Sequence, residues 1–590
     1  MAVNSYRDDE TSQERSKIQT LKRLFSYLLA YKWQLVLVLF IMGYGVLISL
    51  VNPLIYESAI DNYIAVGNLS GLYRLLVLAL ILNLMLVIVI KLRMYIMAKV
   101  CNNILLTIRQ ELYTHIQKLD FQFFDSRPTG KILSRIIGDI NSLKDVLSNC
   151  VTTLIPDGFT VIAVVAIMIY KNPKLALACM LPIPVMAGLT VWIEVKAHPR
   201  WQSFRKKAAN LNAFIHEDMA GIRIIQSFHA QKETRDTFDI LIGEHRGAFM
   251  DAVRISDAFG SVIDFFWGLG CIFLYFSGIV ILGVEEVSVG TFIAFGAYLT
   301  MFWQPIHNIS NFYNQLVTNI AGAERIFEIM DTPPAIADGK EVEEMPEIIG
   351  EVTFEHVSFS YDEQTKVLDD VSFRIKPGET IALVGPTGAG KTTIVNLISR
   401  FYDVQQGKVS VDGKEVKKVS IESLRRQMGI MTQDNFLFSG TIKDNIRYGK
   451  LDATDEEIIA AAKAVGAHDF IMKLDKGYDT ELTERGGGLS IGQKQLLAFA
   501  RTMVSMPKIL ILDEATSSID TKTELLVQSG IEHLLQGRTS FVIAHRLSTI
   551  QKADRIFVID DGRIVEEGNA KELLEKKGLY YQLYMAQFAV

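Results

Sequence analysis

The stretch TIALVGPTGAGKTT, from Thr380 to Thr393, decides the kind of fold that the second half of this chain adopts. Its first half is a short apolar run that predicts a buried β-strand, and its second half matches the pattern G-x-x-x-x-G-K-[ST]. In such a loop, backbone N–H groups at the N-terminus of the following helix surround phosphate groups. We expect phosphate contacts from the whole loop, which consists of Gly385, Pro386, Thr387, Gly388, Ala389, Gly390, Lys391, Thr392 and Thr393.

Several side chains near this loop have the chemistry for nucleotide hydrolysis. Lys391 is expected to reach the β- and γ-phosphates, and the Thr392 hydroxyl is expected to bind Mg²⁺. A second apolar strand, ILILDE, ends in Asp513 and Glu514. At a strand end, Asp513 suits a Mg²⁺ ligand and Glu514 suits a general base that polarises an attacking water. The sequence therefore predicts ATP and Mg²⁺ as ligands.

Further strands and helices surround this loop in the sequence. The runs VTFEHVSFSY, TSFVIAH and RIFVID alternate with helical stretches, which predicts a soluble α/β domain over residues 351–590. The preceding segment DTPPAIADGKEVEEMPE is rich in proline and acidic residues. This composition indicates a linker over residues 331–350.

The first 330 residues have a different, strongly apolar character. The chain is 49% hydrophobic and only 21% charged, which fits a membrane part joined to a soluble part. Six apolar runs have membrane-spanning length, namely residues 33–51, 75–90, 151–170, 175–193, 259–282 and 289–306. We therefore predict a six-span membrane domain over residues 1–330.

Charge near these runs predicts their orientation. Six spans place both ends of the domain on one side, and the N-terminal flank is basic whereas the 51–71 loop carries Glu57 and Asp61 and no basic residue. Lys171 and Lys174 depart from this pattern, because they would lie outside. The N-terminus has no signal-peptide pattern. We expect the N-terminus and the α/β domain to be cytoplasmic.

Long charged segments separate the second span from the third and the fourth from the fifth. They favour helices that continue from the membrane into the cytoplasm, each pair joined by a turn near residues 123–135 and 217–233. The alternative is a pair of ordinary solvated helical hairpins. The net charge of −6 gives no indication of a nucleic-acid partner, and Cys101, Cys150, Cys179 and Cys271 lack metal-ligand spacing.

The phosphate loop, LSIGQ, ILILDE, SSID and VIAHR follow one another in this order, after six apolar runs. Over nearly its full length the chain resembles an ABC half-transporter of the multidrug and lipid exporter type. The resemblance implies a helical membrane domain with long cytoplasmic extensions fused to an α/β P-loop ATPase domain. It also implies dimerisation with a second half-transporter, alternating access driven by ATP, and coupling roles for the turns at Pro128–Gly130 and Gly221–Phe228.

The resemblance assigns roles to further residues. Tyr361 is implied to stack on adenine, and Gln433 to sense Mg²⁺ and the attacking water. Glu514 is implied as catalytic base and His545 as a γ-phosphate ligand, although a histidine at a strand end can also be purely structural. The roles implied at subunit contacts fall on Asp520, Glu484 and Arg485.

The family pattern LSGGQ is LSIGQ here, with isoleucine at position 491. The resemblance implies that Ser490, Gly492 and Gln493 contact the nucleotide held by the partner chain. We expect Ile491 to restrict the backbone of this turn and to crowd that nucleotide. Because Asp513, Glu514 and the phosphate loop are intact, the pattern favours the glutamate-bearing subunit of a heterodimeric bacterial multidrug exporter. A homodimer that tolerates isoleucine is the alternative.

The sequence is least informative about the substrate. Asp157 and Asp264 lie in or near predicted spans and could favour cationic amphiphiles, or they could hydrogen-bond neighbouring helices. Trp267, Phe273 and Phe302 could line an aromatic cavity or pack against lipid and core. We expect export of small amphiphiles across a bacterial cytoplasmic membrane, with a lipid or glycolipid flippase as the alternative. A non-transporting switch protein and an importer fit six fused spans less well.

Overall fold

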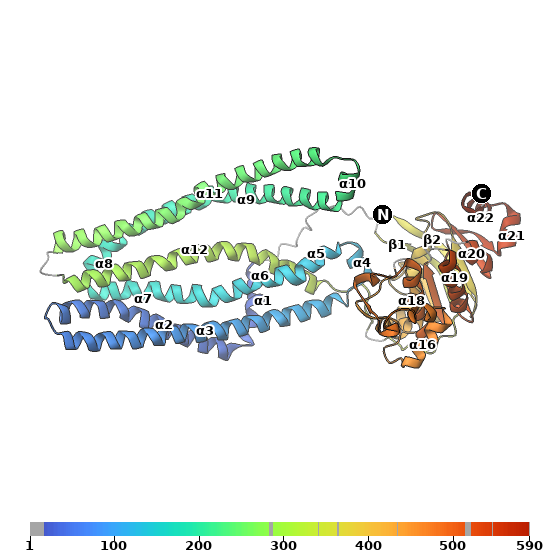
Figure 1. Cartoon of the computed structure of the whole chain (residues 1–590), viewed down its shortest axis with the longest axis horizontal. Coiled ribbons are helices and arrows are strands. Elements are labelled where there is room, and N and C mark those ends of the chain that lie inside the picture. The colour runs from blue at the N-terminus through green and yellow to red at the C-terminus, as the bar shows by residue number, and fades with distance from the viewer. Residues whose placement is uncertain are drawn as a thin grey trace. The chain divides into compact units, whose positions relative to one another are not determined.

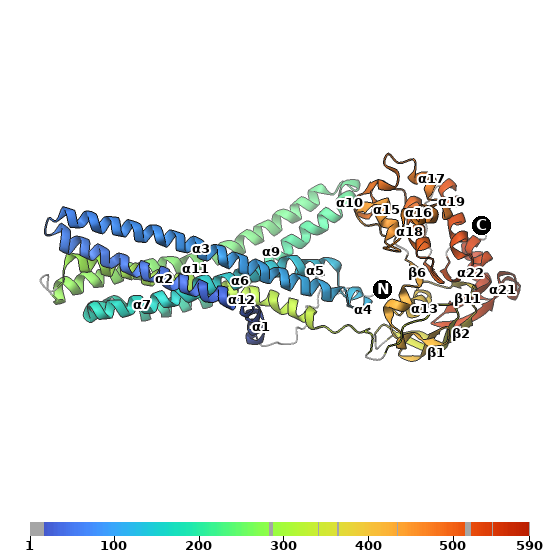
Figure 2. The ribbon, with the colours of Figure 1, turned by 90° about the horizontal axis from the view of Figure 1, so that it is seen from below.

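The computed structural model describes residues 17–282, 287–339, 342–362, 365–432, 435–513, 521–544 and 547–588. Contacts divide the chain into two compact units, each shown from two sides in Figures 1 and 2. The helical unit contains the described residues up to Gln117 together with Thr129–Thr332. The α/β unit contains Lys118–Pro128 and the chain from Pro333 onward.

The helical unit is built from long helices joined by short turns. In chain order they are α1 Lys17–Leu29, α2 Lys32–Ser58, α3 Leu69–Ile116, α5 Thr129–Ser134, α6 Ile140–Asn149, α7 Ile155–Lys171, α8 Pro173–Met180, α9 Ile183–Ala220, α10 Ile222–Ser227, α11 Gln231–Phe276 and α12 Val289–Asp331. The π-helical turns η1 Ala59–Ile64, η2 Arg135–Asp139, η3 Cys150–Leu154 and η4 Ser277–Leu282 continue some of them.

These helices cover all six apolar runs that the sequence contains. Five continuous helical stretches, within Lys32–Ile64, Leu69–Ile116, Thr129–Lys171, Pro173–Ala220 and Gln231–Leu282, are long and apolar enough to cross a membrane by length and composition. The sixth run lies in α12, whose 43 residues pack along α2 and α7. With 48 residues in α3 and 46 in α11, the helices extend far beyond their apolar runs, as predicted.

A carboxylate cluster, formed by Glu57 and Asp61 at the end of α2, joins three helices of this unit. Asp61 Oδ1 accepts a hydrogen bond from the backbone N–H of Gly290 at 2.9 Å, and so caps the start of α12. Glu57 pairs with Lys171 of α7 at 2.7 Å and accepts a hydrogen bond from Thr291 at 2.9 Å. Lys171, which departs from the predicted charge pattern, is thus neutralised by an acidic neighbour.

The two predicted turns contain short helices. The first is α4, Phe121–Asp125, which begins at the N-cap Asp120 and packs within the α/β unit. The second is α10, which lies between α9 and α11 in the helical unit (Figure 2). The four cysteines are free thiols, as their spacing predicts.

The α/β unit is organised around a six-stranded sheet of order β12-β11-β3-β10-β9-β6. The strands are β12 Arg563–Gly568, β11 Arg555–Asp560, β3 Thr380–Val384, β10 Thr539–Ile543, β9 Ile509–Asp513 and β6 Met428–Met431. All neighbours are parallel except β12 and β11. Along β3, Ile381 and Leu383 enter one apolar core and Ala382 and Val384 enter the other. Burial on both faces explains why the strand is a continuous apolar run.

A smaller sheet and a set of helices complete the α/β unit. The sheet has the order β2-β1-β4-β5, with strands β1 Val352–Ser360, β2 Lys366–Ile375, β4 Gln406–Val411 and β5 Lys414–Glu415, and a separate pair is formed by β7 Gly440–Thr441 and β8 Glu481–Leu482. The helices are α13 Lys391–Ile398, α14 Ile421–Arg425, α15 Ile442–Arg447, α16 Asp455–Ala464, α17 His468–Ile471, α18 Ile491–Val504, α19 Thr521–Leu535, α20 Leu547–Lys552, α21 Ala570–Lys576 and α22 Leu579–Phe588, with 3₁₀ turns η5 Val416–Lys418, η6 Gly477–Asp479 and η7 Glu484–Gly486.

Candidate nucleotide-binding site

The sheet topology brings the phosphate loop and Asp513 to the same edge. Ile543 of β10 pairs with Leu383 of β3 on one side and with Asp513 of β9 on the other. The three strands are parallel, so their carboxyl ends meet at one edge, where open α/β sheets bind ligands. The loop that follows Val384 is therefore one strand away from Asp513.

Glycine is required at two positions of the phosphate loop. Gly385 and Gly390 have φ values of 156° and 107°, in the region that side chains rarely adopt. A Cβ atom on Gly385 would lie 2.0 Å from the Ile559 carbonyl oxygen, and one on Gly390 would lie 2.8 Å from Leu368. The loop backbone thus packs closely against β2 and β11. Helix α13 begins directly after Gly390.

Lys391 is held inside this loop. Its Nζ donates hydrogen bonds to the carbonyl oxygens of Gly385 at 2.8 Å and Pro386 at 2.7 Å. Burial lowers the pKa of Lys391, and the negative charge of Asp513 opposes this effect. A half-buried ammonium with one donor left is suited to an anion arriving at the loop.

The residues at this edge fit a magnesium–nucleotide complex. Thr392 is exposed in the first turn of α13, and Asp513 ends β9 at the same edge of the sheet. Hydroxyl and carboxylate oxygens are ligands that Mg²⁺ accepts, usually alongside water and phosphate oxygens. Bound Mg²⁺ would neutralise phosphate charge, while Lys391 and the loop N–H groups of this chain orient the phosphates.

Tyr361 is fixed beside the same helix. Its hydroxyl lies 3.1 Å from the Thr393 hydroxyl and accepts a hydrogen bond from Asn396 at 3.4 Å. The rings of Phe359 and Tyr402 meet its ring nearly edge-on, each with centroids 4.9 Å away. Tyr361 keeps 37% of its surface exposed, so a stacking face remains for the predicted adenine contact.

Tyr402 links the predicted adenine side to α4, and the sequence interpretation missed it. Its hydroxyl donates to Asp125 Oδ2 at 2.5 Å, and burial together with the Asp125 carboxylate raises the pKa of Tyr402 above its usual range. The neighbouring Phe401 packs on Phe121 of α4, with ring centroids 4.5 Å apart. The only available signal in the sequence was the aromatic pair that follows α13. The contact itself joins segments distant in the chain.

The LSIGQ segment adopts a capped helix start. Ser490 is the N-cap of α18 and accepts from the Gln493 backbone N–H at 3.3 Å, while the Gln493 side chain accepts from the Ser490 backbone N–H at 2.9 Å. Ile491 is the first helical residue, and 55% of its surface is exposed. The backbone of Ile491 is helical, a conformation open to any L-residue, and the restriction of this turn relative to glycine stays a prediction. Crowding of a partner's nucleotide stays a prediction, as do the roles of Ser490, Gly492 and Gln493.

Several predicted residues lie outside the described part of the chain. They are Gln433, Glu514, Asp520 and His545, and the side chain of Glu484 is likewise not described. Arg485 is exposed with a positive φ of 56°. The catalytic and interface roles of these residues stay predictions.

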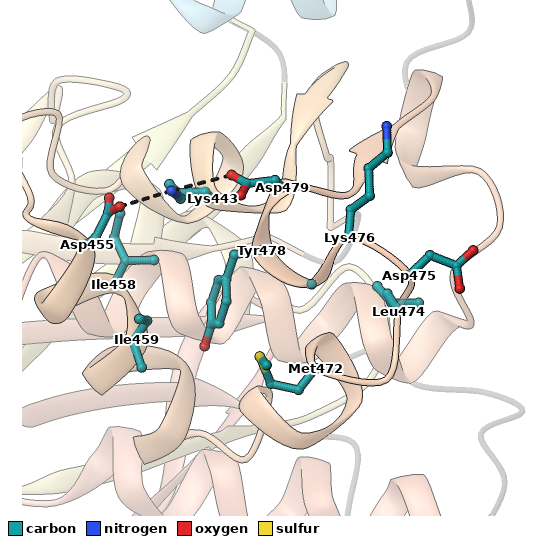
Figure 3. A pocket seen from close by; sticks show the side chains of 11 residues that line it. Lys443, Asp455, Ile458, Ile459, Met472, Leu474, Asp475, Lys476, Tyr478 and Asp479 are labelled. Carbon is teal, nitrogen blue, oxygen red and sulfur yellow. Dashed lines mark hydrogen bonds and ion pairs between the residues drawn. The ribbon is translucent and has the colours of Figure 1, made fainter.

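A separate pocket of about 490 Å³ lies among the helices of the α/β unit (Figure 3). Lys443 lies between Asp455 and Asp479 there, with N–O distances of 2.9 and 3.4 Å, and both carboxylates raise the pKa of Lys443. None of its lining residues belongs to the predicted nucleotide site. This pocket is therefore separate from the predicted phosphate site.

The predicted substrate residues of the helical unit differ in their surroundings. Asp157 accepts a hydrogen bond from Asn308 of α12 at 3.0 Å, whereas Asp264 lies exposed on α11. Phe302 is buried against Trp303, and the indole N–H of Trp267 donates to Thr300 at 3.3 Å. A shared aromatic cavity lined by Trp267, Phe273 and Phe302 stays a prediction.

Comparison with known proteins agrees with both units. Residues 35–306 match the model of the ABC transporter transmembrane region, and residues 368–517 match the ABC transporter model. An uncharacterized ABC transporter ATP-binding protein of Bacillus subtilis (strain 168), YknV, is 41% identical over 586 residues, covering 99% of this chain and 97% of that protein. An ATP-dependent lipid A-core flippase of Syntrophus aciditrophicus (strain SB) is 39% identical, covering 83% of this chain and 82% of the flippase.

A solved structure shares the whole architecture. It is described as a bacterial Atm1-family ABC exporter with ATP bound, and it superposes with a TM-score of 0.79 at 29% identity, covering 95% of this chain and 99% of that chain. With the phosphate loop, Asp513 and the long membrane helices on one chain, this protein belongs to the ABC transporter family, as an exporter half-transporter whose ATPase is coupled to transport.

Proposed function

We propose that this chain is the ATP-hydrolysing half of a heterodimeric exporter of amphiphilic compounds. The observation that carries the heterodimer is Ile491, an exposed side chain at the first position of α18. In the ABC exporters that this chain resembles, this end of the helix faces the nucleotide bound by the partner chain. In this proposal the substitution affects the site that the chain offers to its partner, whereas the chain's own phosphate loop keeps its glycine turns and the bound side chain of Lys391.

The test of this assembly is purification of the tagged chain from its host. We expect it to copurify with a second half-transporter that has an intact LSGGQ signature and lacks a catalytic glutamate. The purified pair should hydrolyse ATP, and the chain alone should not. A defined homodimer of this chain that hydrolyses ATP at about 1 s⁻¹ or faster, a rate typical of enzymes, contradicts the heterodimer.

Amphiphiles are supported by the character of the helical unit. Its helices enclose a cavity that contains the charged side chains of Arg93 and Asp157, next to an apolar groove. This combination suits molecules with one charged and one apolar end. A lipid flippase is the second candidate, favoured by the same two hollows and by the lipid A-core flippase among the relatives. ATP-dependent movement of a headgroup-labelled lipid in proteoliposomes, compared with uptake of an amphiphilic dye, separates the two candidates.

We infer that the N-terminus and the α/β unit face the bacterial cytoplasm. The basic flank of α1 and α2 supports this orientation, as does the acidic 51–71 loop. Lys171 would lie outside in this orientation, but its positive charge is paired with the carboxylate of Glu57. In this orientation ATP reaches the phosphate loop from the cytoplasm, and α4 and α10 lie at the cytoplasmic turns of the helices.

A further inference from the structure

A cavity of about 260 Å³ lies within the helical unit, among α2, α3, α7 and α12, and its largely apolar wall contains a few polar side chains. Its polar lining comes from Ser49, Arg93, Asp157, Thr160 and Gln304. Arg93 lies just beyond the apolar run of α3, after Lys91 and Leu92, and Asp157 lies in the first turn of α7. Charged side chains next to the apolar core of a membrane domain are costly, so a pair of them in one cavity calls for an explanation.

Arg93 and Asp157 attract each other electrostatically, but they form no direct ion pair among the described residues. Asp157 Oδ2 accepts one hydrogen bond, from Asn308, at 3.0 Å. Arg93 Nε is buried and has no hydrogen-bond partner among the described residues. Although both side chains line one cavity, no ion pair joins them among the described contacts. The cavity thus offers guanidinium donors on one wall and carboxylate acceptors on another.

An apolar groove of about 560 Å³ adjoins this cavity, between α2 and α7. The two hollows share Met42 and Val46 of α2. On α7, Pro156 and Phe159 line the groove while Asp157 lines the cavity. Tyr44 is the only side chain of the groove with a polar group. Cavity and groove together are within the range of about 300–1,000 Å³ that is typical of small-molecule sites.

We propose that the cavity and the groove form one binding site for a zwitterionic amphiphile. The anionic group of the headgroup binds Arg93, the ammonium binds Asp157, and the apolar chain occupies the groove between α2 and α7. This inference rests on the proposed export of amphiphiles and specifies the class of substrate. It replaces the preference for cations that Asp157 alone suggests, because Arg93 in the same cavity repels a simple cation.

Binding of three single-chain probes with the same acyl or alkyl length tests the charge requirement. The probes are lysophosphatidylethanolamine as zwitterion, lysophosphatidylglycerol as anion and an alkyltrimethylammonium as cation, added to the purified full-length chain in nanodiscs. We expect the zwitterion to bind about tenfold more tightly than either other probe, since each additional charge contact of about 1.4 kcal/mol corresponds to one decade. Equal affinity for the three probes overturns the proposal.

Single substitutions should shift the preference in opposite directions. Arg93→Gln should lose the zwitterion preference and favour the cation, whereas Asp157→Asn should favour the anion. Arg93→Lys keeps the charge and should restore most of the zwitterion affinity. Asp264→Asn removes an aspartate from α11 that does not line the cavity, and it should change nothing. If both cavity variants weaken all three probes alike, the residues are structural and the proposal is wrong.

The groove and the proposed function are tested separately. Phe159→Ala should weaken all three probes by a similar factor, because it shortens the wall that holds the apolar chain. If the dimer binds none of the probes, the groove is covered by the partner subunit and the proposal is wrong. Charge-selective binding without ATP-driven export contradicts the proposed function alone. Export without charge-selective binding contradicts the binding site alone.

Discussion

Lys391 is the residue of the nucleotide site whose charge the structure makes most sensitive to pH. Burial lowers the pKa of Lys391 from 10.5, so without nucleotide its proton is lost at a lower pH than in the unfolded chain. Across that interval the unfolded state binds more protons, and the free energy of unfolding therefore rises with pH. ATP favours the ammonium form. We expect ATP affinity to fall across the same alkaline interval and binding to take up protons.

Calorimetric titration with ATP in two buffers of different ionisation enthalpy measures this proton uptake. Lys391→Met should bind ATP at least about tenfold more weakly, having lost one charged phosphate contact, and should show no uptake in the same interval. If ATP binding to Lys391→Met still takes up protons in this interval, a group other than Lys391 accepts them.

Ile491 is the second residue whose effect can be isolated. In the first turn of α18 it is more than half exposed, so Ile491→Gly should cost at most about 1 kcal/mol of stability. If its side chain crowds the partner's nucleotide, this variant should hydrolyse ATP in dimers of this chain alone, whereas the unaltered chain alone should not. Ile491→Leu keeps the bulk and should not gain activity. Steady-state ATPase rates are measured for the unaltered chain, Ile491→Gly and Ile491→Leu. Equal rates in the three proteins contradict crowding of the nucleotide by Ile491.

At the scale of elements, α4 contacts the rest of the α/β unit through the Tyr402–Asp125 hydrogen bond and the Phe121–Phe401 ring contact, and its N-cap Asp120 accepts a hydrogen bond from the Ala335 backbone N–H at 2.6 Å. Tyr402→Phe removes the 2.5 Å hydrogen bond to Asp125 and leaves the ring beside Tyr361. We expect a loss of about 0.5–1.5 kcal/mol in unfolding free energy, typical of one hydrogen bond. A double-mutant cycle with Asp125→Asn should give a coupling energy of similar size. The affinity of Tyr402→Phe for ATP should equal that of the unaltered chain, whereas the stimulation of its ATPase activity by transported compounds should be weaker.

The start of α12 depends on close contact with α2. A Cβ atom on Gly290 would lie 2.5 Å from the Asp61 carboxylate and 2.6 Å from the Glu57 carbonyl oxygen. Gly290→Ala should therefore displace Asp61 from its capping position and lower the melting temperature of the full chain. Gly296→Ala, on the same helix with open space around its Cβ, is the matched control. Equal melting temperatures for the two variants would show that the cap is dispensable.

At the scale of the whole molecule, local patterns in the sequence were sufficient for both fold classes. TIALVG, ILILDE and RIFVID became β3, β9 and β11 because a strand buried on both faces is a continuous apolar run. Contacts between distant segments had no such signal. The placement of α4 in the α/β unit and the cavity shared by Arg93 and Asp157 arise from tertiary packing.

The orientation of the whole molecule gives the last prediction. Lys174, at the start of α8, and Ile224, on α10, are both exposed and lie on opposite sides of the membrane in the proposed topology. The four native cysteines lie in the helical unit, and none is exposed, so labelling of them should be slow. With a membrane-impermeant maleimide, Lys174→Cys should react in intact cells and Ile224→Cys only after permeabilisation. The reverse pattern would place the α/β unit outside the cell, away from ATP, and would overturn both the topology and the proposed export.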